Sequence, residues 1–166
     1  LLTQEIHPSG RKLLEGKCKI VVAPDTTQKT LIEYAEDADA IILRSASKAT
    51  QEVMDNAKNL KVISRTGMGV DNIDVKAATE RGIMVCNTPR VNNLSVCEHA
   101  IGMILHLAKQ LSLMDNAVRS GNWAIRNANI GIELEGKTLG VVAMGDIGSL
   151  VAEKCYHGLG MKILAF

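Results

Sequence analysis

Residues 136–166, GKTLGVVAMGDIGSLVAEKCYHGLGMKILAF, decide the fold of this chain because they form one predicted strand-turn-helix-strand unit. Residues 138–143 are a short apolar run without alternation, which is typical of a parallel strand buried on both faces. A helix is predicted next, and its apolar stripe is formed by Ile147, Leu150, Val151 and Cys155. Gly158 and Gly160 are predicted to end this helix, and residues 161–166 start a second strand.

The turn between this strand and this helix, residues 143–148, lies where a dinucleotide-binding fold places the pattern G-x-G-x-x-G. The second and third glycines are present as Gly145 and Gly148, and Ala143 replaces the first. Because a strand precedes the turn and a helix follows it, a cofactor loop at a helix N-terminus is favoured over an ordinary turn. Ala143 adds a methyl group and Asp146 a negative charge, and both predict weak cofactor binding.

The composition is typical of a globular protein, with 46% hydrophobic and 22% charged residues among 166 and a net charge of +1. The small net charge predicts no nucleic-acid partner, and no apolar run approaches the roughly 20 residues that span a bilayer. The four cysteines lack C-x-x-C spacing and lie in apolar stretches, which favours buried reduced thiols over disulfides or a zinc site. We therefore expect a cytoplasmic protein without a signal peptide, and the first residue predicts that the chain begins inside its gene product.

Strands and helices alternate along the first half of the chain, with short links between them. Strands are predicted at 1–5, 18–23, 38–43, 60–64 and 83–86, and helices at 8–16, 27–35, 50–57 and 75–81. This order predicts a parallel sheet with helices on both faces. Function in such sheets gathers in the loops beyond the carboxyl ends of the strands, so residues 44–47 and 65–70 are the candidate loops.

These two loops contain groups that suit a small anion. Gly67 and Gly69 allow backbone N–H groups to converge on a carboxylate. Arg44 supplies a fixed positive charge, and a guanidinium matches a carboxylate or a phosphate. An ordinary turn and a solvated surface charge are the alternatives, and for each residue taken alone they are favoured.

A long helix is predicted from Ser95 to about Ser120, because Ser95 and Glu98 match the S-x-x-E capping box. At 1.5 Å per residue it would be about 36 Å long. Its apolar stripe is wider than packing on one sheet face requires, which predicts contact with a second lobe or a partner subunit. His99 and His106 lack a carboxylate or thiol that would complete a metal site with them, so no metal is expected.

Five stretches occur in a recognisable order: ILRSASKAT (42–50), GMGVDNIDVKAATERGIMVCNTP (67–89), NNLSVCEHAIGMILHLAKQ (92–110), RSGNW (119–123) and GKTLGVVAMGDIG (136–148). In them the chain resembles the D-isomer-specific 2-hydroxyacid dehydrogenases, most closely their phosphoglycerate dehydrogenase branch. The resemblance implies an α/β fold in which residues 1–94 are an incomplete flavodoxin-like substrate domain with a parallel sheet. Residues 95–166 would be the start of a Rossmann-type nucleotide-binding domain, with its first βαβ unit, and would include a helix, 95–120, through which the protein forms a homodimer.

The resemblance also implies roles for particular residues. The substrate would contact Arg44, Ser45, Gly67, Met68 and Gly69. The cofactor, NAD or NADP, would contact Met68, Gly145, Asp146, Ile147 and Gly148. The catalytic Arg, Glu and His of the family belong to later segments, so we expect this chain to be an N-terminal portion without a catalytic residue of its own.

Two functions follow from these expectations. The first is part of an NAD-dependent oxidoreductase for a small 2-hydroxy or 2-keto acid, similar to 3-phospho-D-glycerate dehydrogenase and implying a role in serine biosynthesis. The second is a short non-catalytic module derived from this fold, which dimerises or binds a partner. Ala143 and Asp146 favour the module, whereas the intact pattern of both substrate loops favours the oxidoreductase, which we prefer.

Overall fold

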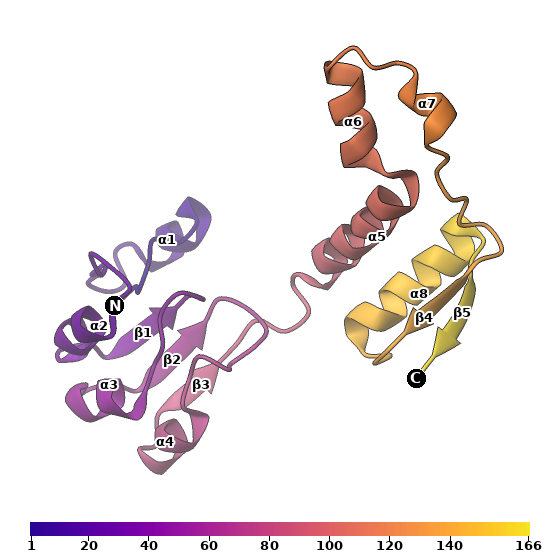
Figure 1. Ribbon diagram of the computed structural model, residues 1–166. Helices are drawn as coiled ribbons and strands as arrows, with labels where there is room; N and C mark the ends of the chain where they lie inside the picture. Colours follow the sequence, from indigo (N-terminus) through magenta and orange to yellow (C-terminus); the bar gives the residue numbers. More distant parts are fainter. The chain divides into compact units, whose positions relative to one another are not determined.

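The computed structural model describes residues 1–166 and divides into two compact units, residues 1–91 and 92–166 (Figure 1). Each unit contains parallel strands connected through helices. The structure therefore has the mixed α/β character predicted for the chain. The boundary expected between residues 94 and 95 falls inside the first helix of the second unit.

The first unit is built on a parallel sheet of three strands in the order β1, β2, β3 (Figure 1). The strands are β1 (Ala40–Leu43), β2 (Val62–Arg65) and β3 (Met84–Cys86). Their carboxyl ends lie at one edge of the sheet because all three run in the same direction. The loops after β1 and β2 are therefore neighbours, as the sequence predicted.

The strands predicted at 1–5 and 18–23 are wrong as full strands. Leu2 forms isolated parallel bridges to Val22 on one side and to Ile42 on the other. The chain leaves the sheet after Thr3, whose side-chain oxygen accepts a hydrogen bond from the Arg44 amide at 3.2 Å. Pro24 has no N–H group with which the other segment could extend its ladder.

Four helices belong to the first unit: α1 (Pro8–Leu14), α2 (Gln28–Ala35), α3 (Gln51–Asn56) and α4 (Val75–Glu80). The last three each begin after a residue whose side-chain oxygen accepts a hydrogen bond from a backbone N–H of the first turn, and these capping residues are Thr27, Thr50 and Asp74. The core between helices and sheet is apolar, and its fully buried side chains include Leu31, Ile41, Leu43, Val53 and Ile63.

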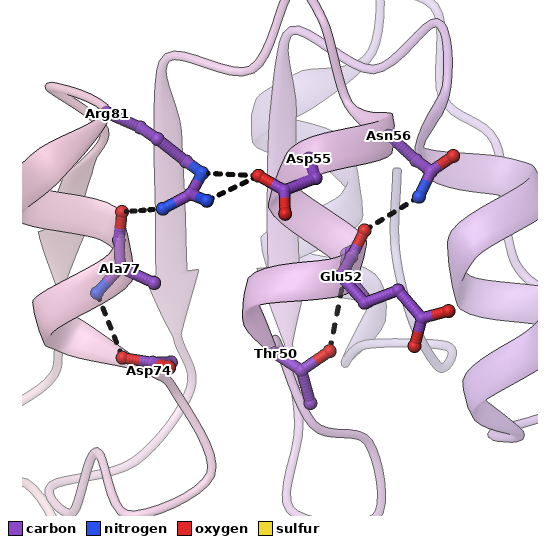
Figure 2. Close-up of polar contacts among 8 residues, drawn as sticks. Thr50, Glu52, Asp55, Asn56, Asp74, Ala77 and Arg81 are labelled. Carbon is purple, nitrogen blue, oxygen red and sulfur yellow. Dashed lines mark hydrogen bonds and ion pairs between the residues drawn. The ribbon is translucent and has the colours of Figure 1, made fainter.

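A polar contact ties α3 to α4 at the rim of this core, as Figure 2 shows. Arg81, which directly follows α4, donates from Nε to the Asp55 carboxylate of α3 at 2.8 Å. The same guanidinium donates from Nη1 to the carbonyl oxygen of Ala77 at 2.8 Å. Helices α3 and α4, which follow the two candidate loops in the chain, are thus held together by apolar packing and by a charge-assisted hydrogen bond.

The second unit contains three helices followed by a strand-helix-strand unit (Figure 1). The helices are α5 (Asn93–Lys109), α6 (Leu111–Arg119) and α7 (Ile125–Ala128). The strands β4 (Thr138–Val141) and β5 (Lys162–Ala165) pair in parallel, and α8 (Asp146–Leu159) connects them. Helix α5 packs on α8 through the buried cluster Cys97, Val151, Cys155 and Met161. The strand-helix-strand order predicted from residues 136–166 is present, and Gly160 takes the left-handed conformation that ends α8. The predicted burial of its first strand on both faces is wrong, because Thr138 and Gly140 of β4 are exposed and only Val141 is buried.

The single helix predicted from Ser95 to Ser120 is wrong. Gln110 adopts a left-handed conformation, with φ 52° and ψ 42°, which ends α5 and separates it from α6. The Gln110 amide turns back onto the carbonyl oxygens of His106 and Leu107. Helix α5 also begins before Ser95, so the expected capping box is not formed. No helix in the structure combines the length and the apolar character that a transmembrane segment needs.

Candidate functional site

Arg44 directly follows β1 and is anchored at the carboxyl edge of the first sheet. Its Nη1 atom donates a hydrogen bond to the carbonyl oxygen of Glu5 at 2.7 Å. Its backbone amide donates to Thr3 Oγ1 at 3.2 Å. Arg44 and the neighbouring Ser45 are exposed, so the guanidinium is held in place while its other N–H groups remain available to a ligand.

The segment Gly67, Met68 and Gly69 follows β2, and only part of its backbone is available to an anion. The Gly67 amide donates to the carbonyl oxygen of Arg65 at 3.0 Å. This N–H group is therefore already engaged within the turn, whereas the sequence predicted that it would bind an anion. The carbonyl oxygens of Gly67 and Met68 accept hydrogen bonds from Thr88 N and Asn87 Nδ2, at 3.0 and 2.8 Å. The amides of Met68 and Gly69 have no partner within the chain and are the donors left for a carboxylate.

Arg65 brings a second positive charge to the same edge. Its Nε donates to Asn72 Oδ1 at 3.1 Å, and its Nη1 donates to the carbonyl oxygen of Thr66 at 2.5 Å. A Cβ atom at Gly67 would lie 2.5 Å from Arg65 Nη1. Glycine at position 67 therefore makes room for the Arg65 guanidinium, which lies directly over the turn.

Asp71 is an opposing charge beside this segment. A Cβ atom at Gly69 would lie 2.6 Å from Asp71 Oδ1, so the carboxylate lies against Gly69. An anion bound at Gly69 would be repelled by Asp71 and attracted by the positive charges of Arg44 and Arg65 at the same edge of the sheet. The three charges predict a site that selects the orientation of an anion as well as its sign.

The sequence analysis overlooked Asn72, which is the residue that connects the two loops. Its side-chain nitrogen donates to the carbonyl oxygens of Arg44 and Ser47 at 3.0 and 2.8 Å. An asparagine five residues after a glycine in a loop gives a weak signal, because asparagine is common in turns. Its partners lie 25 and 28 residues away in sequence, and only the folded chain brings them together.

The turn before α8 has the geometry of a phosphate-binding loop, with two departures. Gly145 is the N-cap of α8 and makes no side-chain cap hydrogen bond to the N-terminal amides of this helix. A Cβ atom at Gly148 would lie 2.2 Å from the carbonyl oxygen of Ala143, so glycine allows the helix to approach the turn closely. Ala143 has φ 73°, which a residue with a side chain adopts at a cost, and Asp146 occupies the first helical position. The glycines and the helix N-terminus fit a pyrophosphate, whereas Ala143 and Asp146 oppose one.

The cysteines and the other ionisable residues form no further centre. No group of three or more His, Cys, Asp or Glu side chains is arranged to hold a metal ion. All four cysteines are free thiols. Cys97 and Cys155 are buried as predicted, whereas the prediction of burial is wrong for Cys18 and Cys86, which are exposed.

A comparison with known protein families identifies the family of this chain. The sequence profile of the D-isomer specific 2-hydroxyacid dehydrogenase family, catalytic domain, matches residues 1–164. The chain belongs to this family. The resemblance inferred from the sequence motifs is therefore confirmed.

Curated relatives within the D-isomer specific 2-hydroxyacid dehydrogenases place the chain near one branch. It is 41% identical to D-3-phosphoglycerate dehydrogenase of Methanocaldococcus jannaschii over 166 residues, which are 100% of this chain and 31% of the relative. It is 39% identical to D-3-phosphoglycerate dehydrogenase of Homo sapiens over 167 residues, again 100% of this chain and 31% of the relative. The chain thus spans about a third of the length of these curated relatives.

Solved structures confirm the fold class. The D-lactate dehydrogenase from Aquifex aeolicus, crystallised with NAD and lactic acid, has a TM-score of 0.86 and 28% identity, covering 99% of this chain and 50% of that one. The NAD-dependent formate dehydrogenase from Staphylococcus aureus, in complex with NAD, has a TM-score of 0.82 and 28% identity, covering 99% of this chain and 54% of that one. The α/β architecture of this chain is therefore that of the family.

Proposed function

We propose that the full-length protein containing this chain is an NAD-dependent oxidoreductase of small D-2-hydroxy acids. The observation that carries this proposal is the pair of cations, Arg44 and Arg65, beside the unpartnered amides of Met68 and Gly69 at one sheet edge. Such an arrangement suits the carboxylate of a 2-hydroxy acid. Membership of the family and the NAD-bound relatives support the same function.

Within this function we assign distinct roles to the loops. Arg44 and Ser45 line the substrate side, and Met68 and Gly69 present their backbone amides to the carboxylate. In the second unit, the turn of Gly145, Asp146, Ile147 and Gly148 contacts the cofactor pyrophosphate, which the close packing at Gly148 supports. NAD supplies the hydride acceptor when bound, and we assign no catalytic acid or base to this chain.

We propose 3-phospho-D-glycerate as the substrate, on two grounds. The curated relatives at about 40% identity are D-3-phosphoglycerate dehydrogenases. A phosphorylated acid has two anionic ends, and the edge that holds Arg44 also holds Arg65 and the exposed Lys48. An unphosphorylated acid such as D-lactate needs only one of these cations.

We further propose that the protein forms a homodimer through α5 and α6. Several large apolar side chains are exposed on these two helices, and Leu107 and Leu111 expose 76% and 49% of their area. Large exposed apolar side chains gathered on one pair of helices are typical of an interface. The alternative, a short non-catalytic dimerising module, is favoured by the strained Ala143 and by the charge of Asp146 in the cofactor turn.

The test is a steady-state assay of the full-length protein, in which NAD reduction is followed with 3-phospho-D-glycerate, D-glycerate and D-lactate. We expect Arg44→Ala to lower kcat/KM by about 10-fold or more, which corresponds to about 1.4 kcal/mol of transition-state binding. Lys76→Ala is the matched control, because Lys76 is an exposed cation on α4 of the same unit and should leave kcat/KM unchanged.

Each outcome of this assay has a distinct meaning. Equal activity of the wild type and Arg44→Ala on every acid would remove Arg44 from the site. Activity on D-lactate without activity on 3-phospho-D-glycerate would overturn the proposed substrate and leave the reaction class intact. No oxidation of any 2-hydroxy acid would favour the non-catalytic module.

A further inference from the structure

The side-chain amide of Asn72 makes the largest set of long-range polar contacts among the candidate loops. Its Nδ2 atom donates to the carbonyl oxygen of Arg44 at 3.0 Å and to that of Ser47 at 2.8 Å. Its Oδ1 atom accepts from Arg65 Nε at 3.1 Å. A primary amide has two N–H donors and one carbonyl acceptor, so both donors and the acceptor of Asn72 are engaged.

These contacts set the shape of the Arg44–Ser47 loop. One NH₂ group holds the first and the last carbonyl of the loop, which fixes the distance between its two ends. The Ser47 side chain does not help, because it is buried and its hydroxyl has no hydrogen-bond partner. The loop therefore depends on Asn72 for its attachment on this side.

The backbone of Asn72 is secured independently of its side chain. Its carbonyl oxygen accepts a hydrogen bond from Ala49 N at 2.9 Å, and Ala49 also forms a parallel bridge with Ile73. The side chain is thus not needed to hold residue 72 in place. From this fixed backbone position, the side-chain amide forms hydrogen bonds with the two segments that contain Arg44 and Arg65.

We propose that Asn72 is a positioning residue, which sets Arg44 and Arg65 at the spacing that a substrate anion requires. This inference rests on the proposed function, because it takes the substrate to be an acid bound at these two cations. Loss of the amide would remove one restraint on the Arg44 backbone and one on the Arg65 guanidinium together. A misplacement of about 1 Å at a binding group is enough to lower activity by up to about 100-fold.

Three variants of the full-length protein test this role. Asn72→Asp keeps the size of the side chain and its acceptor for Arg65, but it places an oxygen opposite the two carbonyl oxygens. Asn72→Ala removes all three hydrogen bonds, and Asn72→Gln keeps the amide on a chain one methylene longer. The control is Asn56→Asp, because the exposed Asn56 also donates from Nδ2 to a carbonyl oxygen, that of Glu52, at 2.8 Å (Figure 2).

The readout is a pair of Michaelis constants, for 3-phospho-D-glycerate at saturating NAD and for NAD at saturating acid, together with the melting temperature. We expect Asn72→Asp and Asn72→Ala to raise the KM for the acid about 10-fold or more, with kcat and the KM for NAD within about threefold of the wild type. Asn72→Gln should recover part of the loss. Asn56→Asp should change neither constant.

A purely structural role predicts a different result. Fewer folded molecules would lower kcat and the melting temperature and leave the KM for the acid unchanged, which would overturn the proposal. Failure of all three variants to fold would also overturn it, because Asn72 would then be a folding residue. An inactive wild type would remove the proposed function and this inference together, whereas an active wild type with unchanged KM in folded variants would remove this inference alone.

Discussion

Replacement of Gly148 by alanine tests whether close packing of α8 on the preceding turn builds the cofactor loop. The new Cβ atom would lie 2.2 Å from the carbonyl oxygen of Ala143 and 3.3 Å from a methyl carbon of Val141. The first contact is with backbone, which cannot rotate away as a side chain can. Either α8 or the turn must move, and both lie where the pyrophosphate is proposed to bind.

The size of the effect follows from two opposing terms. Overpacking of a close contact costs about 1–3 kcal/mol. Alanine is favoured over glycine inside a helix by about 0.5–1 kcal/mol, which offsets part of this cost. We therefore expect a net loss of up to about 2.5 kcal/mol in the free energy of unfolding of the second unit.

Urea unfolding followed by tryptophan fluorescence measures this loss, because the single tryptophan, Trp123, belongs to the second unit. Gly158→Ala is the matched control in the same helix, since a Cβ atom there would meet nothing within 4 Å. It should raise the free energy of unfolding by about 0.5–1 kcal/mol. If Gly148→Ala were as stable as Gly158→Ala, the close approach of α8 to the turn would be refuted.

Three further predictions concern the dimer, the cofactor and the cysteines. Leu107→Glu combined with Leu111→Glu should turn a dimer into monomers in sedimentation, because unpaired charge in an apolar contact is costly, and Leu13→Glu, an exposed control in the first unit, should not. Asp146→Arg should tighten NADH binding in calorimetry, with a smaller gain at high salt, and an unchanged constant would remove Asp146 as the cause of weak binding. Burial raises the pKa of the Cys155 thiol above its usual value of 9.0, so the contribution of the buried neutral thiol to stability is complete below pH 9.0 and falls as the pH rises further. Because Cys18 and Cys86 are exposed, a thiol reagent should label them rapidly in the folded chain. The buried Cys97 and Cys155 should react only after unfolding, and rapid labelling of all four cysteines would contradict the fold.

The sequence was sufficient where short-range patterns decide the structure. Apolar runs in the sequence correctly located β1, β2, β4 and β5, although only β1 and β2 are largely buried and most residues of β4 and β5 are exposed. The helical spacing of apolar residues correctly predicted α8, and Gly160 correctly predicted where this helix ends. The positions of both candidate loops followed directly, since loops at the carboxyl ends of parallel strands share one edge.

The sequence-based prediction was wrong for the helices α5 and α6. The apolar stripe continues without interruption from α5 into α6, so periodicity alone predicts one helix. Gln110 breaks it by adopting a left-handed conformation, although glutamine is a good helix former. Ser95 and Glu98 match a capping box, yet the helix already begins at Asn93.

The sequence by itself determined the strand order along the chain, the two glycine-containing loops and the family. Only the tertiary structure decided how the loops work as a site. It showed that the Gly67 amide is engaged, that Arg65 lies over Gly67, and that Asn72 joins two loops distant in sequence. The physical reason is that backbone periodicity and turn chemistry act over a few residues, whereas a hydrogen bond across 25 or 28 residues exists only once the sheet has brought its partners within 3 Å.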